Sequence, residues 1–213
     1  MIYKNLNPEK ALIWRIVHRD NLPWILENGL NCSSSGRTDP NFVTIGNVDL
    51  IEKRRFRSVP VSPGGTLADY IPFYFTPFSV MLLNIKSGRG VTQRSNGEIV
   101  ILVSSLHHLI DRQRTVIFTD AHAFPAWASY YNDPACLHKI DWPLLQRRDF
   151  KRDPDDLKKI ERYQAEALVH SHLPASELLG MVTYDDKVRQ LVQEQVARCG
   201  LSIPVYARPG WYF

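Results

Sequence analysis

Glu166 is the residue whose type and position most clearly suggest chemistry. It stands near the start of Ala165–Val169, an apolar stretch that predicts a β-strand, and the highly charged stretch Arg147–Lys159 precedes it. A carboxylate fixed at a strand edge beside a polar loop can hold a substrate hydroxyl and stabilise positive charge in a transition state. The alternative is a solvated glutamate at a strand end, because glutamate side chains are usually exposed.

Two adjacent arginines, Arg54 and Arg55, end the predicted helix Val48–Arg55. A guanidinium presents a rigid fork of donors that fits a pyrophosphate or a DNA phosphate. Cations at the end of a helix also compensate its dipole, and that interpretation stays open for a bare pair of arginines.

The histidines and cysteines do not form a metal-binding pattern. His170 and His172 are two residues apart on a predicted strand, which places them on one face without a nearby cysteine or aspartate, so we expect no metal site. The three cysteines are widely spaced and form no CxxC pair. His122 follows the predicted strand Thr115–Thr119, where functional groups often lie, although a hydrogen-bonded turn histidine would look the same.

Several enzyme classes lack their sequence signature in this chain. There is no GxSxG nucleophile elbow, no GxGxxG dinucleotide-binding turn and no GxxxxGK[ST] phosphate loop. An α/β-hydrolase, a Rossmann enzyme and a P-loop enzyme are therefore disfavoured.

Composition indicates one folded domain, residues 1–213, with 44% hydrophobic residues and a net charge of +4. Positive charge gathers at Lys53–Arg57, Lys86–Arg94 and Arg147–Lys159, near aromatic residues, as a phosphate backbone and unstacked bases would require. Ordinary solvated faces are the alternative. No apolar run is long enough to cross a membrane and no signal core precedes the domain, so we expect a soluble cytoplasmic protein with no membrane partner.

Local patterns predict a mixture of strands and helices without strict βαβ alternation, which indicates an α+β fold with a central split, mixed or antiparallel sheet. Two prolines in Asp69–Phe78 favour an edge or bulged strand there. The other extended segments that we expect are Ala11–Val17, Glu98–Ser104, Thr115–Thr119, Ala165–Val169, Glu177–Thr183, Ile203–Tyr206 and Gly210–Phe213. The expected helices are Leu22–Asn28, Val48–Arg55, Val80–Ile85, Ser105–Ile110, Pro125–Asn132, Leu137–Leu145 and Asp186–Arg198.

Six segments, in order and spanning nearly the whole chain, resemble the DarT family of DNA ADP-ribosyltransferases. They are Trp14–Leu22, Ile51–Arg55, Pro63–Pro77, Phe118–His122, Tyr163–Val169 and Gly210–Phe213. The resemblance implies the fold of poly-ADP-ribose polymerases, with NAD as co-substrate in a cleft between two small sheets. It also implies transfer of ADP-ribose to thymine in single-stranded DNA within a short sequence context, as the toxin of a toxin–antitoxin pair. The implied partners are single-stranded DNA and a DarG-type macrodomain antitoxin.

The resemblance assigns the catalytic glutamate to Glu166 and the catalytic arginine to Arg54, with a one-residue slip to Arg55 left open. It also implies that Asn31–Arg55 embraces NAD and that Arg147–Arg162 faces the acceptor. Some family members carry a first-strand histidine that faces the ribose, where this chain has Arg15, so the ribose contact stays open. The NAD-binding residues that we expect are Arg15, His18, Asn21, Leu30, Gly46, Arg54, Tyr74 and His122.

For DNA we expect stacking and phosphate contacts from side chains around the two loops. The expected DNA-binding residues are Arg55, Phe56, Arg147, Arg148 and Arg152. Phe42, Tyr74 and Phe150 are further stacking candidates, and Tyr74 fits a core position better. Another acceptor (guanine, RNA or protein) and a non-catalytic nucleic-acid-binding module on the same fold are the alternatives, and Glu166 with Arg54 favours an enzyme.

Overall fold

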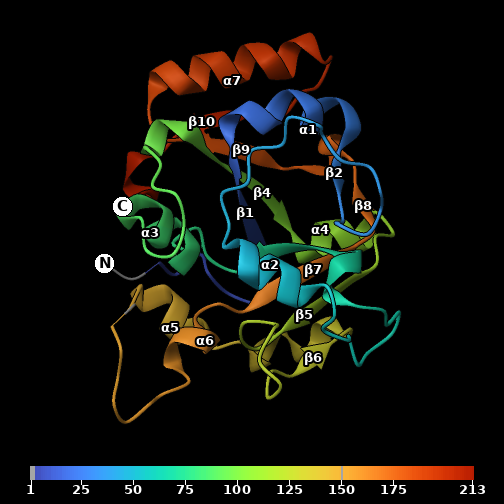
Figure 1. Cartoon of the computed structure of the whole chain (residues 1–213), viewed down its shortest axis with the longest axis vertical. Helices are drawn as coiled ribbons and strands as arrows, with labels where there is room; N and C mark the ends of the chain where they lie inside the picture. Colours follow the sequence, from blue (N-terminus) through green and yellow to red (C-terminus); the bar gives the residue numbers. More distant parts are fainter. Residues whose placement is uncertain (1–2, 150) are drawn as a thin grey trace.

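The computed structural model describes residues 3–149 and 151–213, which form a mixed α+β fold (Figure 1). Within these residues a main sheet has the strand order β10-β9-β4-β1-β3-β7-β5-β6, and β2 and β8 form a separate ribbon. The strands of the main sheet are β1 (Leu12–His18), β3 (Tyr70–Tyr74), β4 (Ile99–Ser105), β5 (Val116–Thr119), β6 (Tyr130–Tyr131), β7 (Glu166–His170), β9 (Gly180–Thr183) and β10 (Val205–Ala207). The ribbon consists of β2 (Leu30–Asn31) and β8 (His172–Leu173).

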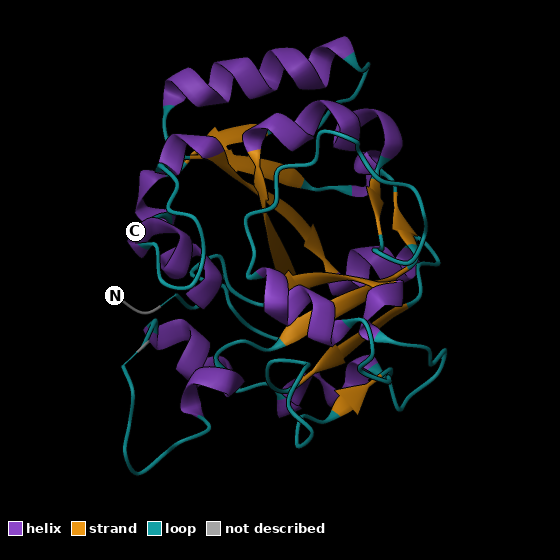
Figure 2. Ribbon diagram, in the orientation of Figure 1, coloured by secondary structure: helices purple, strands orange, loops and turns teal. Residues whose placement is uncertain are grey.

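Helices surround the sheet (Figure 2). They are α1 (Leu22–Asn28), α2 (Val48–Arg54), α3 (Val80–Ser87), α4 (Leu106–Asp111), α5 (Trp142–Arg147), α6 (Lys159–Arg162) and α7 (Asp186–Arg198). Short 3₁₀ turns span Arg19–Asn21, Leu67–Asp69, Asn96–Glu98, Pro134–Lys139, Ala175–Glu177 and Pro209–Trp211. In the part of the chain that the structure describes, no helix combines the length and apolar character needed to span a bilayer.

The main sheet is split between β1 and β3. β1 is paired with β4 along its whole length, and β3 is paired with β7 along its whole length, yet β1 and β3 meet only at Trp14 and Tyr74. Beyond that pair, Arg15 reaches across and its Nη1 donates a hydrogen bond of 2.8 Å to the Pro72 carbonyl. Pro72 has no N–H to offer to β1, so the strands separate here without leaving a main-chain donor unpaired. The two strands therefore leave an opening in the middle of the main sheet.

Apolar side chains fix both halves of the sheet. In α7, Val188, Val192 and Val196 repeat every four residues and are buried, so one face of this helix packs on β9 and β10. The strand β4 is almost entirely buried, which matches its uninterrupted apolar sequence. The half with β3, β7 and β5 has a smaller second core, which includes Leu67, Ile117 and Leu168.

The structure departs from the local sequence patterns in several places. The segment expected as an edge or bulged strand, β3, is not at an edge, because its two sides face β1 and β7. Residues 125–132 do not form the expected helix, since Tyr130 pairs with Thr119 in β6. The C-terminal segment forms a 3₁₀ turn at Pro209–Trp211 where we expected a strand.

The fourth difference concerns His170 and His172, which were expected on one strand. They lie on β7 and β8 respectively, because Ser171 between them has a positive φ of 65° and breaks the strand. His170 packs against Tyr70 and His172 contacts the Asn28 carbonyl, so the pair does not share one face. Across residues 3–149 and 151–213 no three histidine, cysteine or acidic side chains lie together as a metal site would require.

Candidate active site

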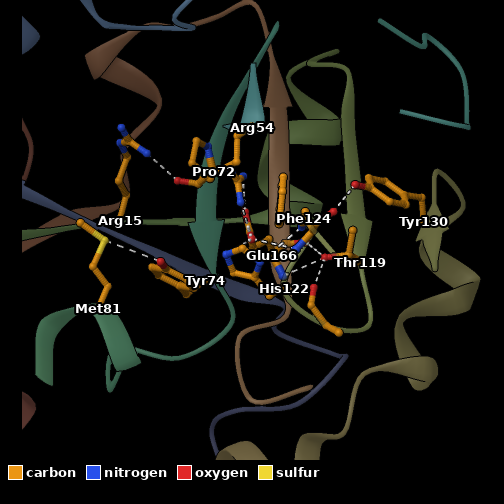
Figure 3. Close-up of polar contacts among 12 residues, drawn as sticks. Arg15, Arg54, Pro72, Tyr74, Met81, Thr119, His122, Phe124, Tyr130 and Glu166 are labelled. Atoms are coloured by element: carbon orange, nitrogen blue, oxygen red, sulfur yellow. Dashed lines mark hydrogen bonds and ion pairs between the residues drawn. The ribbon is translucent and has the colours of Figure 1, made fainter. Parts of the chain in front are cut away.

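A cleft lies where β1 and β3 separate, under the segment 42–51 and the helix α2. Its volume is about 180 Å³. Glu166, Arg54, Arg15, Tyr74 and His122 meet there from five different elements or loops (Figure 3). The remaining lining residues are Ile16, Val17, Asn21, Phe42, Thr44, Ile45, Gly46, Asn47, Leu50, Ile51, Pro72 and Met81.

Glu166 is the first residue of β7 and is only 1% exposed. Arg54 holds both oxygens of its carboxylate, with Nη1 2.9 Å from Oε1 and Nη2 2.7 Å from Oε2. The Ala123 N–H donates a further hydrogen bond of 2.9 Å to Oε1. Oε1 therefore accepts hydrogen bonds from two donors, Arg54 and Ala123. Among the described residues, Oε2 accepts a hydrogen bond from Arg54 alone. Oε2 is consequently the oxygen better placed to accept a substrate hydroxyl.

Arg54 is the last residue of α2, a helix whose start is capped by Asn47 and which buries none of its own residues. The ion pair with Glu166 is therefore the strongest link between α2 and the sheet. Burial by itself disfavours both charges, but their attraction outweighs it, so the pKa of Arg54 is raised and the pKa of Glu166 is lowered. Arg55 points elsewhere: its side chain is 49% exposed and lies 3.5 Å from Glu52.

His122 lies beside the Glu166 carboxylate, with Nε2 3.7 Å from Oε1. Its Nδ1 accepts the Phe124 N–H at 3.3 Å, so in the neutral ring the proton is on Nε2 and faces the glutamate. The His122 N–H donates to the Glu161 carbonyl at 2.8 Å, which joins this turn to α6. Burial lowers the pKa of His122 and favours the neutral ring.

Arg15 and Tyr74 form the opposite wall. Arg15 is buried, and burial lowers its pKa to about 10. Its Nε has no partner among the described residues, while its Nη1 binds Pro72. Tyr74 donates to Met81 Sδ at 3.7 Å, and burial raises its pKa to about 12. The expected core role for Tyr74 is wrong, because the ring lines the cleft.

Asn21 and Gly46 belong to the covering segment of the cleft. Both atoms of the Asn21 amide are used by Val43: Nδ2 donates to its carbonyl at 2.9 Å and Oδ1 accepts its N–H at 2.8 Å. Asn21 thus holds the covering segment to the base of β1 and positions it. Gly46 allows close packing, because a Cβ there would lie 3.1 Å from Ile51 Cδ1.

Two residues expected at the NAD site do not line the cleft. His18 is buried on the other face of β1, where Nδ1 accepts the Asp20 N–H and Nε2 lies 3.5 Å from Glu98. Strand alternation explains this, since positions three apart point to opposite faces. Leu30 is buried opposite Leu173 in the ribbon.

The residues expected to bind DNA fall into two groups. Phe56 is 83% exposed, and the side chains of Arg55, Arg147 and Arg152 also face solvent. Arg148 has an internal role instead: its guanidinium stacks on Phe78 and Phe213, 4.3 and 4.7 Å from the ring centroids, and donates to the carbonyls of residues 210 and 212. Phe150 lies outside the described residues.

Sequence reasoning missed an aromatic–cation pair between the turn that precedes β6 and the start of α6. Trp127 is 39% exposed, and Lys158 Nζ lies 4.6 Å from the centroid of its ring. The hydrogen bond from Arg57 Nη2 to the Pro125 carbonyl, 3.3 Å, brings the end of α2 next to this turn. The local pattern predicted a helix over residues 125–132 and so gave no signal for an exposed tryptophan.

Comparison with known proteins agrees with this architecture. The split, mostly antiparallel sheet with a buried glutamate in its opening is consistent with the expected fold of ADP-ribosyltransferases. The family model described as "ssDNA thymidine ADP-ribosyltransferase, DarT" matches residues 14–213. A DNA ADP-ribosyl transferase of Escherichia coli O127:H6 is 54% identical over 210 residues, which cover 98% of this chain and 96% of that protein.

Solved structures give the same result. DarT of Thermus sp. 2.9 in complex with ADP-ribosylated ssDNA superposes with a TM-score of 0.90 at 29% identity, covering 100% of both chains. The same Thermus protein in complex with NAD+ gives a TM-score of 0.86 at 30% identity, covering 97% of this chain and 99% of that one. The chain therefore belongs to the DarT family of DNA ADP-ribosyltransferases and is an NAD-dependent enzyme.

Proposed function

We propose that this enzyme transfers ADP-ribose from NAD to a thymine base of single-stranded DNA in a short sequence context, as the toxin of a toxin–antitoxin pair. The observation that carries the proposal is the buried Glu166 carboxylate, held by Arg54 and the Ala123 N–H in the opening between β1 and β3. Membership of the DarT family supports the acceptor and the biological role.

Glu166 acts as a fixed negative charge. NAD supplies the ADP-ribosyl group when its nicotinamide–ribose bond breaks, and positive charge then develops on the ribose. Glu166 is fixed at the start of a buried strand, so its carboxylate needs little reorganisation to hold a ribose hydroxyl through Oε2 and stabilise that charge. Removing one such preorganised group costs on the order of 3 kcal/mol, or about 10²-fold or more in rate.

Arg54 and His122 complete the chemistry. The ring nitrogen N3 of thymine is weakly acidic. It gives up its proton to water, and a permanent cation stabilises the anion as it attacks the ribose and nicotinamide leaves. Arg54 lines the cleft and touches Glu166, so it can orient the acceptor beside the reacting centre. The neutral His122 directs its Nε2 proton toward the carboxylate from 3.7 Å and adds a polar group beside it.

The residues of the cleft fit NAD. Two buried guanidinium groups, Arg15 and Arg54, face one carboxylate, which leaves an excess of positive charge for a dinucleotide with a diphosphate. The unpartnered Nε of Arg15 provides a donor for a polar group of the ligand. The present space of about 180 Å³ lies below the roughly 300–1,000 Å³ of typical ligand pockets, so the covering segment moves when NAD binds.

Exposed aromatic and cationic side chains lie just after α2 and on the turn before β6, which Arg57 links to one another, and they suit a single strand. Phe56 and Trp127 project from neighbouring segments and offer surfaces on which bases can stack, and Lys158 and Arg55 offer charge to the phosphates. A base paired in a duplex would first have to be unpaired at a cost of a few kcal/mol, which a single strand avoids. A DarG-type macrodomain antitoxin that removes the modification is the partner we propose on the basis of the family.

Mass spectrometry of synthetic single strands incubated with NAD tests the proposal. One set contains thymine in varied contexts, a second set lacks thymine, and E166Q protein is the control. We expect a mass gain of one ADP-ribose on thymine strands alone, and none with E166Q. NAD consumption without a gain on any strand would overturn the DNA acceptor in favour of RNA or protein, and gain on strands that lack thymine would favour guanine.

A further inference from the structure

Thr119, the last residue of β5, occupies a position between the main chain of Glu166 and the turn that binds its side chain (Figure 3). Its side chain is fully buried. Its hydroxyl accepts the Glu166 N–H at 3.2 Å and donates to the Ala121 carbonyl at 2.5 Å. Both hydrogen-bonding functions of this hydroxyl are therefore used, one on the catalytic strand and one on the turn.

The pairing of β5 with β7 shows why a side chain is needed here. The ladder runs through Val116, Ile117 and Phe118 and ends at the pair of Phe118 with Ala167. Glu166 is the next residue of β7, and its N–H is bound by the hydroxyl of Thr119 instead of by a main-chain carbonyl of β5. This substitution lets β5 separate from β7 at Thr119, where β5 still pairs with β6, and lets the chain turn back over the glutamate.

The turn that begins at Thr119 supplies the remaining fixed contacts of the carboxylate. Its Ala123 N–H binds Oε1, and His122 lies against the same oxygen. Tyr130 donates a hydrogen bond to the Ala123 carbonyl and fixes the far end of the turn. The Ala121 carbonyl is the point at which the Thr119 hydroxyl fixes the near end.

We infer that Thr119 is a positioning residue for the ADP-ribosyl transfer: its hydroxyl sets the conformation of residues 119–123 so that the Ala123 N–H holds the Glu166 carboxylate in its reactive orientation, with His122 beside it. This inference rests on the catalytic role proposed for Glu166. Arg54 sits on α2 at the edge of the NAD cleft, whereas these main-chain contacts lie behind the carboxylate, so they remain in place when ligand enters.

Valine has nearly the shape of threonine without the hydroxyl, and serine keeps the hydroxyl, so T119V and T119S separate the hydrogen bonds from packing. We expect T119V to lower kcat about tenfold or more, as loss of one or two hydrogen bonds at a reacting centre implies, with KM for NAD unchanged. T119S should retain a kcat within about twofold of wild type, because its hydroxyl makes the same two contacts.

Thr183 provides a matched control. It is equally buried, and its hydroxyl donates to the Asp185 carbonyl at the end of β9, away from the cleft. We expect T183V to lower the melting temperature and to leave kcat unchanged. Y130F provides a second route to the same turn if T119V does not fold, and we expect it to lower kcat with KM for NAD unchanged.

Three outcomes are distinguishable when wild type, E166Q, T119V, T119S and T183V are assayed together below their melting temperatures. Activity of T119V equal to that of wild type, or equal loss in T119V and T119S, would overturn the role of the hydroxyl. Equal loss of kcat in T119V and T183V would show that Thr119 contributes to stability and does not position Glu166. A wild type that consumes no NAD, or an E166Q protein that is fully active, would instead overturn the proposed function.

Discussion

Arg54 and Glu166, 112 positions apart in the sequence, form a bidentate ion pair that joins the helix α2 to the first residue of β7. The glutamate is almost fully buried, and the arginine side chain is 14% exposed. A planar guanidinium matches the two oxygens of a carboxylate, which a lysine ammonium cannot do. The pair thus places the two proposed catalytic residues in contact and closes the covering helix over the cleft.

Replacement of Arg54 by lysine keeps the charge and removes the fork. We expect R54K to lower kcat/KM for DNA modification by about 10²-fold, because one ammonium cannot hold both Glu166 oxygens and orient an acceptor. Steady-state kinetics with a thymine-containing strand measures this. The matched control is R189K, since Arg189 pairs with Asp186 on the surface of α7, away from the cleft, and we expect it to keep near wild-type kinetics. Full activity of R54K would show that bidentate geometry is not required.

Replacement of Glu166 tests chemistry and stability together. We expect E166Q to lose about 10²-fold or more in kcat, because a neutral amide cannot stabilise a positive ribose. It should also be less stable, by about 3–5 kcal/mol, since removing one partner leaves the buried Arg54 charge uncompensated.

E177Q is the control for this prediction. Glu177 binds Arg114 through three hydrogen bonds of 2.5–3.0 Å outside the cleft. We expect E177Q to lower the free energy of unfolding in chemical denaturation without changing kcat. Equal kinetic losses in E177Q and E166Q would mean that Glu166 contributes only to stability.

The cleft should make the protein less stable at acidic pH. Burial lowers the pKa of His122 below its ordinary value of 6.5, so the unfolded chain takes up a proton that the folded chain does not. The free energy of unfolding therefore falls as pH decreases through about 6.5, by at most about 1.4 kcal/mol per pH unit for one proton. Below 4.5 the lowered pKa of Glu166 adds a loss of the same sign.

Urea unfolding between pH 8 and pH 5 measures the first part of this loss. We expect H122N to show a shallower decrease than wild type over this range, because its side chain takes up no proton in either state. Parallel curves for the two proteins would contradict the shifted histidine.

Local sequence predicted the elements better than it predicted their neighbours. The apolar run of β4 and the four-residue valine repeat of α7 specify a strand and a helix by themselves. The interior position of β3 depends on pairing with β1 and β7, which lie far away in the sequence, and its prolines pointed to an edge. Pro72 is tolerated inside the sheet because the strands separate at that point.

For the site, too, the sequence indicated single residues better than it indicated which of them meet. Glu166 was identifiable as a carboxylate at the start of a strand, but its pairing with Arg54 rather than Arg55 depends on the direction in which α2 ends. His18 and Arg15 are both polar residues of one strand, and only the fold shows which face opens onto the cleft. The exposure of Trp127 could not be predicted from the sequence. The local pattern indicated a helix over residues 125–132, whereas this segment forms a turn that leads into β6, which pairs with β5.

Trp127 should contribute to binding of the DNA strand. We expect W127A to raise KM for a single-stranded substrate by about 5- to 150-fold, since stacking of one base on an aromatic ring contributes about 1–3 kcal/mol. KM for NAD should stay unchanged. The control is Y206A, because Tyr206 is 47% exposed with Arg208 5.3 Å above its ring, on the strand β10 at the opposite end of the sheet. Equal effects of W127A and Y206A would exclude a DNA path over the Trp127 turn.

Asn21 should control the segment that covers the cleft. Its amide makes two hydrogen bonds to Val43, of 2.9 and 2.8 Å, and holds residues 42–51 over the space where we place NAD. In N21A both bonds are lost, at a cost of about 1 kcal/mol each, and the covering segment must be ordered when NAD binds. We therefore expect KM for NAD to rise roughly tenfold and limited proteolysis between residues 31 and 47 to become faster. N96A is the control, because Asn96 is a buried asparagine that donates to the Phe213 carbonyl away from the cleft. If N21A and N96A had the same KM for NAD, the two bonds of Asn21 would hold the fold and not the covering segment.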